Sequence, residues 1–436
     1  MVNQFVEQES YPLMEKAFNL VELFSGIGSQ AKALKNIGFN INVQATCEWD
    51  MHAFIAYDAI HVGHDVLPQV REMTMKEVYE KLCSYTLSNN GKEPMNQTTL
   101  HSYGEEVLKR MYTAILRDKN LVDISKVTGD QMPDDTDVMT YSFPCQDLSN
   151  VGAFHGYNKG IDKESGSRSS LLWQVGRILT EMKEKGKTLP RYLVMENVPT
   201  LLSERHINNF NTWKADLEAL GYISKEFQLN AKDFGIPQNR PRLLMISVFI
   251  GDDENRKAAI EEYFKKTTPK SIVNDYVESE YYNNITVKEL LRLADTPDSP
   301  YWQEAVDCTP NDTTSRRKIW LENPQIVKED GSLTDEPFIR TITTKQDRHP
   351  NSGNIYFNSG IEGRGTFRYL TPRECMLFMG FTDEDYESIM ANNPPVKIHS
   401  FLFPRDKIIR MAGNSIPVKL LEGFFYQLYK LEKINR

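Results

Sequence analysis

FNLVELFSGIGSQAKALKNIG, residues 18–38, contains three patterns in succession. FNLVELF (18–24) is an apolar run of strand length, glycines follow it, and the remainder has the spacing of a helix. Gly26, Gly28 and Ala31 fit the G-x-G-x-x-G/A spacing of nucleotide-binding turns. The order of strand, glycine turn and helix therefore predicts the first unit of a nucleotide-binding α/β sheet.

A carboxylate lies at the end of the next predicted strand, INVQATCEW (41–49). Glu48 comes twenty residues after Gly28, where a carboxylate can accept hydrogen bonds from a ribose. Trp49 can stack on an adenine ring or simply pack in the core. The pattern fits a nicotinamide enzyme and an S-adenosylmethionine methyltransferase equally, because both bind an adenosine there. It also fits a tight turn beside a solvated Glu48.

Strand and helix patterns alternate along the first half of the chain. Strand patterns occur at 137–143, 191–198 and 240–250, and a helical pattern occurs at 169–185. This alternation predicts an α/β fold with a doubly wound, Rossmann-like and mostly parallel sheet. The stretch 51–118 carries helical patterns and is expected to be an insertion between two units of the sheet.

The composition is that of an ordinary globular protein, with 40% hydrophobic and 25% charged residues. Apolar runs stay below the length of a bilayer span and the first residues lack a signal-peptide pattern, so we expect a cytoplasmic protein without a membrane partner. Five scattered cysteines without a CxxC pair argue against a disulfide framework and a zinc site. The net charge of −9 argues weakly against nucleic acid, because a local basic cleft can coexist with an acidic remainder.

Reactive groups occur where predicted strands begin or end. Cys145, in SFPCQDLS, follows one strand pattern, and Glu196 lies at the end of the next. Gln238, Arg240 and Arg242 alternate along QNRPR, so that in a strand they would share one face. Because ligands of open α/β sheets bind beyond the carboxyl ends of strands, we expect these groups to converge on one rim. A buried structural thiol is the alternative for Cys145.

Eight stretches then occur in one order along the chain: FSGIGS, CEWD, the DI of LVDIS, SFPCQDLS, MENV, NAKDFGIPQNRPR, FRYLTPRECMLFMGF and GNSIPV. In this order the chain resembles the DNA (cytosine-5) methyltransferases of bacterial or phage type, from residue 24 to residue 418. The resemblance covers 51–118 poorly. It implies sequence-specific transfer of a methyl group from S-adenosylmethionine to C5 of a flipped-out cytosine, through a covalent cysteine adduct at C6.

The resemblance implies a role for each reactive group. Cys145 would be the nucleophile, and Glu196 would hold cytosine N3 and the exocyclic amine. Arg242 would contact cytosine O2, while Arg240 and Gln238 would shape the pocket. The cytosine must leave the duplex for this contact to occur. Substrate binding would also involve Pro144, Gln146, Asn197 and Ser149, the last of which would contact a DNA phosphate.

A second set of residues would hold the cofactor: Phe24, Gly26, Gly28, Glu48, Trp49, Asp123, Ile124 and Asn414. In the family the glycine turn faces the methionine end, and Glu48 would bind the ribose. Asp123 would accept from the adenine amine, with Trp49 and Ile124 on either side of the ring. The sequence departs from the pattern here, because the insertion at 51–118 separates Glu48 widely from Asp123.

The resemblance also predicts two domains. Residues 1–246 and 410–436 would form the catalytic domain that binds the cofactor. Residues 247–409 would form a smaller domain, with target recognition mainly in 251–365. The family usually acts as a monomer, and a nucleoid-associated prokaryotic enzyme is expected.

Double-stranded DNA is the expected partner, and a cognate restriction endonuclease acting on the same site is left open. Acidic residues outnumber basic ones in 247–340, so the basic candidates for DNA contact are TTSRRKIW (313–320) and TTKQDRHP (343–350). Either stretch can instead be a solvated loop. The sequence leaves three other functions to weigh: a tRNA cytosine-5 methyltransferase of the same fold, a nicotinamide dehydrogenase, and a binding module without activity.

Overall fold

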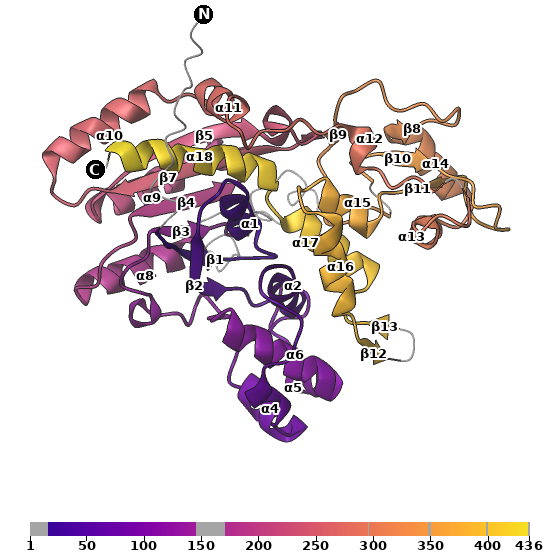
Figure 1. The fold of residues 1–436 in the computed structure, drawn as a ribbon, viewed down its shortest axis with the longest axis horizontal. Helices are drawn as coiled ribbons and strands as arrows, with labels where there is room; N and C mark the ends of the chain where they lie inside the picture. Colours follow the sequence, from indigo (N-terminus) through magenta and orange to yellow (C-terminus); the bar gives the residue numbers. More distant parts are fainter. Residues whose placement is uncertain (1–15, 145–170, 295, 348–349, 398–399, 435–436) are drawn as a thin grey trace, which may run out of the picture.

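The computed structural model describes residues 16–144, 171–294, 296–347, 350–397 and 400–434. A six-stranded sheet with the order β2-β1-β3-β4-β7-β5 forms the centre of the larger part of the molecule (Figure 1). Its strands are β1 (Phe18–Leu23), β2 (Ile41–Cys47), β3 (Val138–Tyr141), β4 (Tyr192–Asn197), β5 (Tyr222–Asn230) and β7 (Pro241–Phe249).

The sheet is mostly parallel. β1 pairs in parallel with β2 and β3, and β3 pairs in parallel with β4. β7 lies between β4 and β5 and runs antiparallel to both, since the short connection from β5 turns the chain straight back. The doubly wound, mostly parallel α/β fold expected from the sequence is confirmed.

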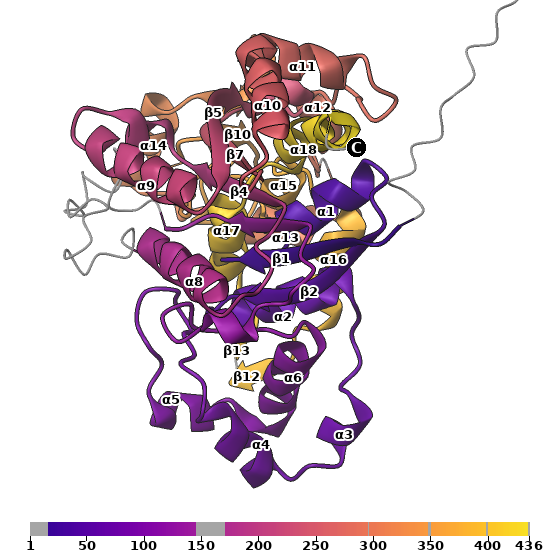
Figure 2. The ribbon, with the colours of Figure 1, turned by 90° about the vertical axis from the view of Figure 1, so that its left-hand side faces the viewer.

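Helices cover both faces of the sheet (Figures 1 and 2). In β4 the side chain of Val194 belongs to one apolar core, whereas Leu193 and Met195 belong to another. Both faces are therefore buried, which is why the strands read as continuous apolar runs. The first core includes α1 (Ser29–Asn36) and α18 (Val418–Ile434), and the second includes α8 (Leu172–Glu184) and α9 (Ile207–Ala219).

The stretch between β2 and β3 leaves the sheet as a group of helices and then returns to it. Asn120 forms a parallel bridge with Thr46 of β2, and the Leu121 amide donates to the Thr46 carbonyl at 2.8 Å. The helical segment expected at 51–118 thus begins and ends beside the same strand. Its helices are α2 (Met51–His61), α3 (Pro68–Arg71), α4 (Met75–Leu82), α5 (Gln97–His101) and α6 (Gly104–Arg117).

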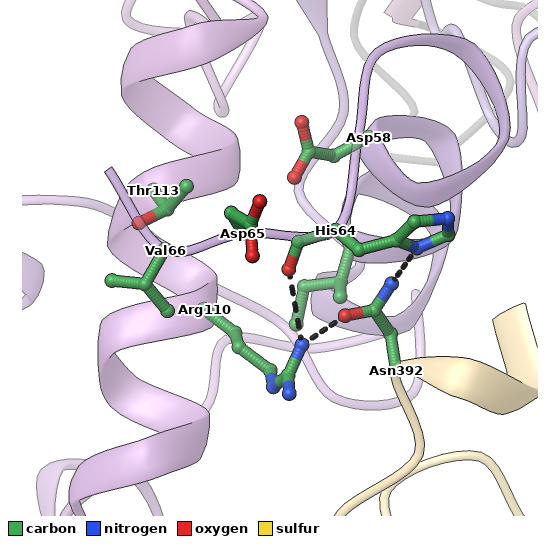
Figure 3. A pocket seen from close by; sticks show the side chains of 8 residues that line it. Asp58, His64, Asp65, Val66, Arg110, Thr113 and Asn392 are labelled. Atoms are coloured by element: carbon green, nitrogen blue, oxygen red, sulfur yellow. Dashed lines mark hydrogen bonds between the residues drawn. The ribbon is translucent and has the colours of Figure 1, made fainter. Parts of the chain in front are cut away.

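A small pocket marks the place where this helical segment meets α16 (Asp383–Ala391) (Figure 3). Arg110 of α6 donates to the side-chain oxygen of Asn392 and, at 3.5 Å, to the carbonyl of His64. The Asn392 amide also contacts the His64 ring. These bonds join 51–118 to the C-terminal half of the chain.

The smaller part of the molecule comes after α11 (Pro269–Val277) in the chain. Its strand β9 (Ile339–Arg340) pairs in parallel with β6 (Gln238–Asn239), a short strand between β5 and β7. The remaining strands form a three-stranded sheet, β11-β10-β8, and the hairpin of β12 and β13. Besides β9 and α16, the elements are α12 (Val287–Leu290), α13 (Trp302–Asp307), α14 (Thr314–Glu322), β8 (Gln325–Val327), β10 (Asn354–Tyr356), β11 (Phe367–Arg368), α15 (Pro372–Leu377), β12 (Pro395–Lys397), β13 (Ser400–Phe401) and α17 (Arg405–Asn414).

The two helices that follow β7 pack on the larger part of the molecule, although the boundary expected at residue 247 assigns them to the smaller domain. α10 (Glu254–Lys266) and α11 (Pro269–Val277) pack against β5 and α18, on the larger part of the molecule (Figure 1). Their buried side chains, Ile260 and Tyr276 among them, belong to the core that α18 forms with the sheet. The packing of residues 254–277 favours a boundary after α11, and the division into two domains stays a prediction. Within the described part of the chain, no helix is long and apolar enough to cross a membrane.

Candidate active site

The order of the strands reverses between β1 and β3. Such a reversal opens a crevice beyond the carboxyl ends of the two strands, where ligands of doubly wound folds bind. The glycine turn that begins at Phe24 follows β1, and Ser142, Phe143 and Pro144 follow β3. The fold thus brings the glycine turn and the start of the SFPC stretch to one edge of the sheet.

The first half of the glycine turn combines a strained backbone with open space. Phe24 has a left-handed conformation, with φ +60°, and its amide donates to the Cys47 carbonyl at 2.8 Å. Such conformations in non-glycine residues concentrate at functional sites. Gly26 has φ +55°, and apart from Gly26 itself and its two chain neighbours no heavy atom of the described residues lies within 4 Å of the position that a Cβ would take there. Gly26 therefore borders room for a ligand.

Gly28 has a different environment. It caps α1 with φ +80°, and a Cβ there would lie 2.7 Å from the Tyr57 ring and also collide with His61. Both of these side chains belong to α2. The second glycine of the motif therefore allows α2 to pack against the turn, and its contact with a cofactor stays a prediction.

Glu48 connects the glycine turn, which follows β1, to the chain that follows β2. Its Oε2 atom accepts from the Gly26 amide at 3.1 Å, and its Oε1 atom accepts from the Asp50 amide at 2.8 Å. Burial, followed by the negative charge of Asp50, raises the pKa of Glu48 to about 7. A carboxyl group with one backbone donor on each oxygen can still accept further hydrogen bonds.

The return of the chain at Asn120 brings Asp123 and Ile124 to the same edge. The Asn120 side chain accepts from the amides of Glu48 and Val122, at 3.0 Å each, and donates to the Glu48 carbonyl at 2.9 Å. Glu48 and the segment that carries Asp123 are therefore close in space, although they are far apart in sequence. Ile124 is buried, whereas Asp123 is partly exposed and accepts from the amide and hydroxyl of Ser125.

Trp49 is partly buried and packs against the core beside α2. This geometry favours its packing role, and stacking on an adenine stays a prediction.

Glu196 lies at the end of β4, where it is only 8% exposed. Its Oε2 atom accepts from the Ser142 hydroxyl at 2.5 Å, and its Oε1 atom lies 2.8 Å from Arg242 Nε. The NH1 group of Arg242 donates to the Pro241 carbonyl. Three neighbouring strands therefore hold one carboxyl group between a hydroxyl and a guanidinium. Ser142 was not among the predicted site residues, although it lies near the end of the strand pattern at 137–143.

Asn197 fixes the chain that leads to Cys145. Its amide nitrogen donates to the Phe143 carbonyl at 3.1 Å, and its side-chain oxygen accepts from the Val198 amide at 2.9 Å. It is 2% exposed. This geometry favours a positioning role for Asn197 over contact with a substrate.

Gln238 and Arg240 do not share the face of Arg242 as expected, because β6 and β7 belong to different ladders. Gln238 is fully buried, donates to the Phe378 carbonyl at 2.8 Å and accepts from the Ile342 amide at 3.0 Å. Arg240, also buried, donates to the carbonyls of Ile342, Gly413 and Ser415 at 2.7–2.9 Å. Both side chains therefore bind the C-terminal half of the chain to the sheet.

The GNS stretch ends α17. A Cβ on Gly413 would lie 2.6 Å from the backbone carbon of Thr343, so glycine allows the chain at 343–344 to approach. Asn414 is exposed beside this contact. Cys145, Gln146 and Ser149 lie outside the described residues.

Comparison with known proteins places these features in a family. The family model for C-5 cytosine-specific DNA methylases matches residues 83–430. The chain belongs to the C-5 cytosine-specific DNA methylases. It is 30% identical to the type II methyltransferase M2.ScrFI of Lactococcus lactis subsp. cremoris, over 94% of this chain and 98% of that protein. It is also 30% identical to the orphan methyltransferase M.SssI of Spiroplasma monobiae, over 94% and 96% of the two chains.

Among solved structures, the fold is similar to that of the S. pombe Dnmt2 methyltransferase. The TM-score is 0.57 at 16% identity, and the match covers 97% of this chain and 100% of that one. This similarity of fold therefore extends over almost the whole chain. The family model and the two relatives show that the enzyme is a DNA cytosine-5 methyltransferase. The dehydrogenase and the inactive binding module that the sequence left open do not fit this family. The tRNA alternative has less support than DNA.

Proposed function

We propose that this methylase transfers a methyl group from S-adenosylmethionine to C5 of a cytosine within a specific sequence of duplex DNA. The observation that supports this proposal most directly is the Glu196 carboxyl group, held between Ser142 and Arg242 at the same edge of the sheet as the glycine turn. A buried carboxyl group needs such partners, and their position at the carboxyl edge of the sheet points the group toward a ligand.

The residues at the edge fit S-adenosylmethionine. Gly26 borders open space, as a close approach of a ligand to the backbone requires. The adenosine offers ribose hydroxyls and an adenine amine as donors, and Glu48 and Asp123 supply the acceptors. S-adenosylmethionine supplies a methyl group on a positively charged sulfur. In our assignment the turn at Phe24–Gly26 and Gly28 holds its methionine end, Trp49 and Ile124 flank its adenine, and Asn414 closes the site.

The chain's own groups then act on the cytosine. The Cys145 thiolate adds to C6, and the π electron pair of the C5–C6 double bond becomes available at C5 for a new bond to carbon. The cofactor would supply the methyl group for that bond. Loss of the C5 proton to water and departure of the thiolate from C6 then restore the double bond. Glu196 binds N3 and the exocyclic amine, so that the charge that develops at N3 is stabilised. The remaining NH2 group of Arg242 is assigned to cytosine O2.

The neighbours of these groups act indirectly. Asn197 holds the backbone at Phe143 and thereby the approach to Cys145. Arg240 and Gln238 hold the C-terminal half of the chain against the strand that carries Arg242. Pro144 and Gln146 are assigned to the walls of the base pocket, and Ser149 to a phosphate.

Target recognition is assigned to the part of 251–365 that does not pack on the sheet. The two basic stretches lie together there, since Arg316 at the start of α14 contacts Asp347 in the loop 343–350. Within α14 no residue is buried, so its side chains are accessible to a ligand. We assign the enzyme as a monomer on its DNA site. A restriction endonuclease that cuts the same sequence is the partner suggested by the type II name of one relative.

The test is methyl transfer from labelled S-adenosylmethionine to unmethylated duplex DNA and, in parallel, to transfer RNA. We expect label in DNA at one recurring sequence, mapped by bisulfite sequencing, and none with Cys145→Ser, which should still bind DNA. Label found solely in RNA would overturn the substrate. Turnover by Cys145→Ser would overturn the nucleophile.

A further inference from the structure

Asp50, before α2, and Arg410, in α17, form an ion pair between the N-terminal and C-terminal parts of the chain. Asp50 caps α2, where its Oδ1 atom accepts from the His52 amide at 3.1 Å, and its Oδ2 atom accepts from Arg410 of α17. The pair is enclosed, since Asp50 is 7% exposed and a Cβ on Gly91 would lie 3.2 Å from Oδ2. A buried pair of this kind has one defined geometry, unlike an exposed one.

The pair is connected to Glu48 through the backbone. The Asp50 amide donates to Glu48 Oε1, and the opposite oxygen of Glu48 accepts from Gly26 of the glycine turn. A shift of Asp50 therefore moves a donor on the carboxyl group that we assign to the ribose.

On the Arg410 side, the pair is connected through α17 to the candidate base site. Arg410 lies one turn before Gly413 on α17, and the carbonyls of Gly413 and Ser415 accept from Arg240. Arg240 lies two residues before Arg242, whose Nε atom is 2.8 Å from Glu196. One chain of bonds thus runs from the glycine turn through α17 to the carboxyl group of the candidate base site.

We propose that the Asp50–Arg410 pair is a positioning contact that couples cofactor binding to engagement of DNA. Cofactor bound at Glu48 fixes Asp50, Asp50 fixes α17, and α17 fixes the strand that carries Arg242. Coupling of two sites is reciprocal, so DNA must then raise cofactor affinity by the same factor by which cofactor raises DNA affinity. This inference rests on the proposed function, because it takes Glu48 as a cofactor ligand.

The experiment measures the Kd of S-adenosylhomocysteine by calorimetry, with and without duplex DNA, in the full chain. For Arg410→Met we expect affinity in the presence of DNA to fall about fivefold to tenfold, with a loss of most of the enhancement by DNA. The KM for S-adenosylmethionine should rise by a similar factor while kcat changes less. Arg410→Lys keeps the charge and should restore much of the enhancement. The double variant Asp50→Asn/Arg410→Met should lose less than the sum of the losses in the two single variants, because both single variants remove the same ion pair.

Lys407→Met is the matched control. Lys407 lies on the same helix and also reaches the larger part of the molecule, but it donates to the Asn89 carbonyl at 2.6 Å and not to Asp50. This variant should keep the enhancement by DNA. Equal losses in Lys407→Met and Arg410→Met would overturn the proposal, since any loosening of α17 would then suffice.

Glu48→Ala separates the two levels of inference. If it weakens cofactor binding while Arg410→Met binds like the wild type in both conditions, the coupling is wrong and the cofactor site stands. If Glu48→Ala binds like the wild type, the cofactor assignment fails and the coupling fails with it.

Discussion

Glu196 and Arg242 face each other from two antiparallel strands, with Oε1 of the first 2.8 Å from Nε of the second. Leu243, the residue after Arg242, pairs with Asn197, the residue after Glu196. Because β7 runs antiparallel to β4, the start of β7, which carries Arg242, lies at the carboxyl end of β4. The start of a parallel strand would lie at the amino end of β4.

Glu196→Gln keeps the shape of the side chain but weakens its bonds to Arg242 and to the charge that develops on cytosine. We expect the methyl-transfer rate to fall by roughly 10²-fold to 10³-fold, with cofactor affinity unchanged. Glu226→Gln is the control, because Glu226 also pairs with a cation, Lys214 at 2.7 Å, but away from the site. Single-turnover rates decide the matter, and a wild-type rate for Glu196→Gln would remove Glu196 from the mechanism.

Glu48 should make cofactor affinity depend on pH. Burial and then the charge of Asp50 raise its pKa to about 7, and ribose hydroxyls donate most strongly to an ionised carboxylate. Affinity should therefore rise between pH 6 and pH 8, by up to about tenfold per unit below the midpoint. Calorimetry with S-adenosylhomocysteine measures this rise. Glu48→Gln should flatten the profile, and a profile that is already flat in the wild type would contradict the prediction.

Glu22 should make the stability of the fold depend on pH. It is fully buried in β1, where its oxygens accept from Tyr57 at 2.5 Å and from the Ala31 amide at 3.2 Å. Burial raises its pKa from 4.5 to about 7, so the folded state holds a proton that the unfolded state releases above pH 4.5. This stabilisation is complete below pH 4.5 and is lost as the pH rises through 7, by about 1.4 kcal/mol per unit.

Thermal unfolding at pH 6 and pH 8 tests the role of Glu22. The wild type should lose more stability between these values than Glu22→Gln, which carries no titrating group at that position. Because both proteins share every other ionisable residue, the difference between their losses isolates Glu22. Equal losses would show that the carboxyl group does not titrate in this range.

Gly413→Ala should destabilise the protein although it replaces glycine by alanine within a helix. That change usually stabilises a helix by about 0.5–1 kcal/mol. Here the new methyl group would lie 2.6 Å from backbone atoms of Thr343, which cannot rotate away as a side chain would. We expect a loss of about 1–3 kcal/mol in a denaturant titration. An increase in stability would mean that 343–344 moves freely away from α17.

The sequence was sufficient for the parts of the fold that depend on local patterns. The glycine turn, the apolar strands and the helical segment at 51–118 follow from periodicity and turn residues. Pairing between residues that are distant in sequence could not be predicted in this way. The bridge between Thr46 and Asn120, which returns Asp123 to the site, involves no pattern that either residue shows alone.

The same limit explains the outcome for QNRPR. Alternation correctly places Arg242 at the site, but it assumes one continuous strand, and the chain changes ladders between Gln238 and Arg242. Polar side chains that bind backbone carbonyls, such as Arg240, cannot be told from side chains that bind a substrate until the fold shows their partners. The core that the helices at 254–277 cover could not be predicted either, because an amphipathic face does not reveal its partner.

The packing of those helices leads to a prediction about target recognition. An exchange of 251–365 for the same segment of a relative would replace α10 and α11, whose buried residues pack on α18. We expect that chimera to unfold at a lower temperature than the parent. An exchange of 309–365 leaves these helices in place, along with the hydrogen bond that Arg373 donates to Glu304. This shorter chimera should melt like the parent and methylate the relative's sequence, as bisulfite sequencing would show, because it transfers α14 and the loop 343–350 together. If it folds but keeps the parent's target, the bases are read elsewhere, and 51–118 is then the segment to exchange next.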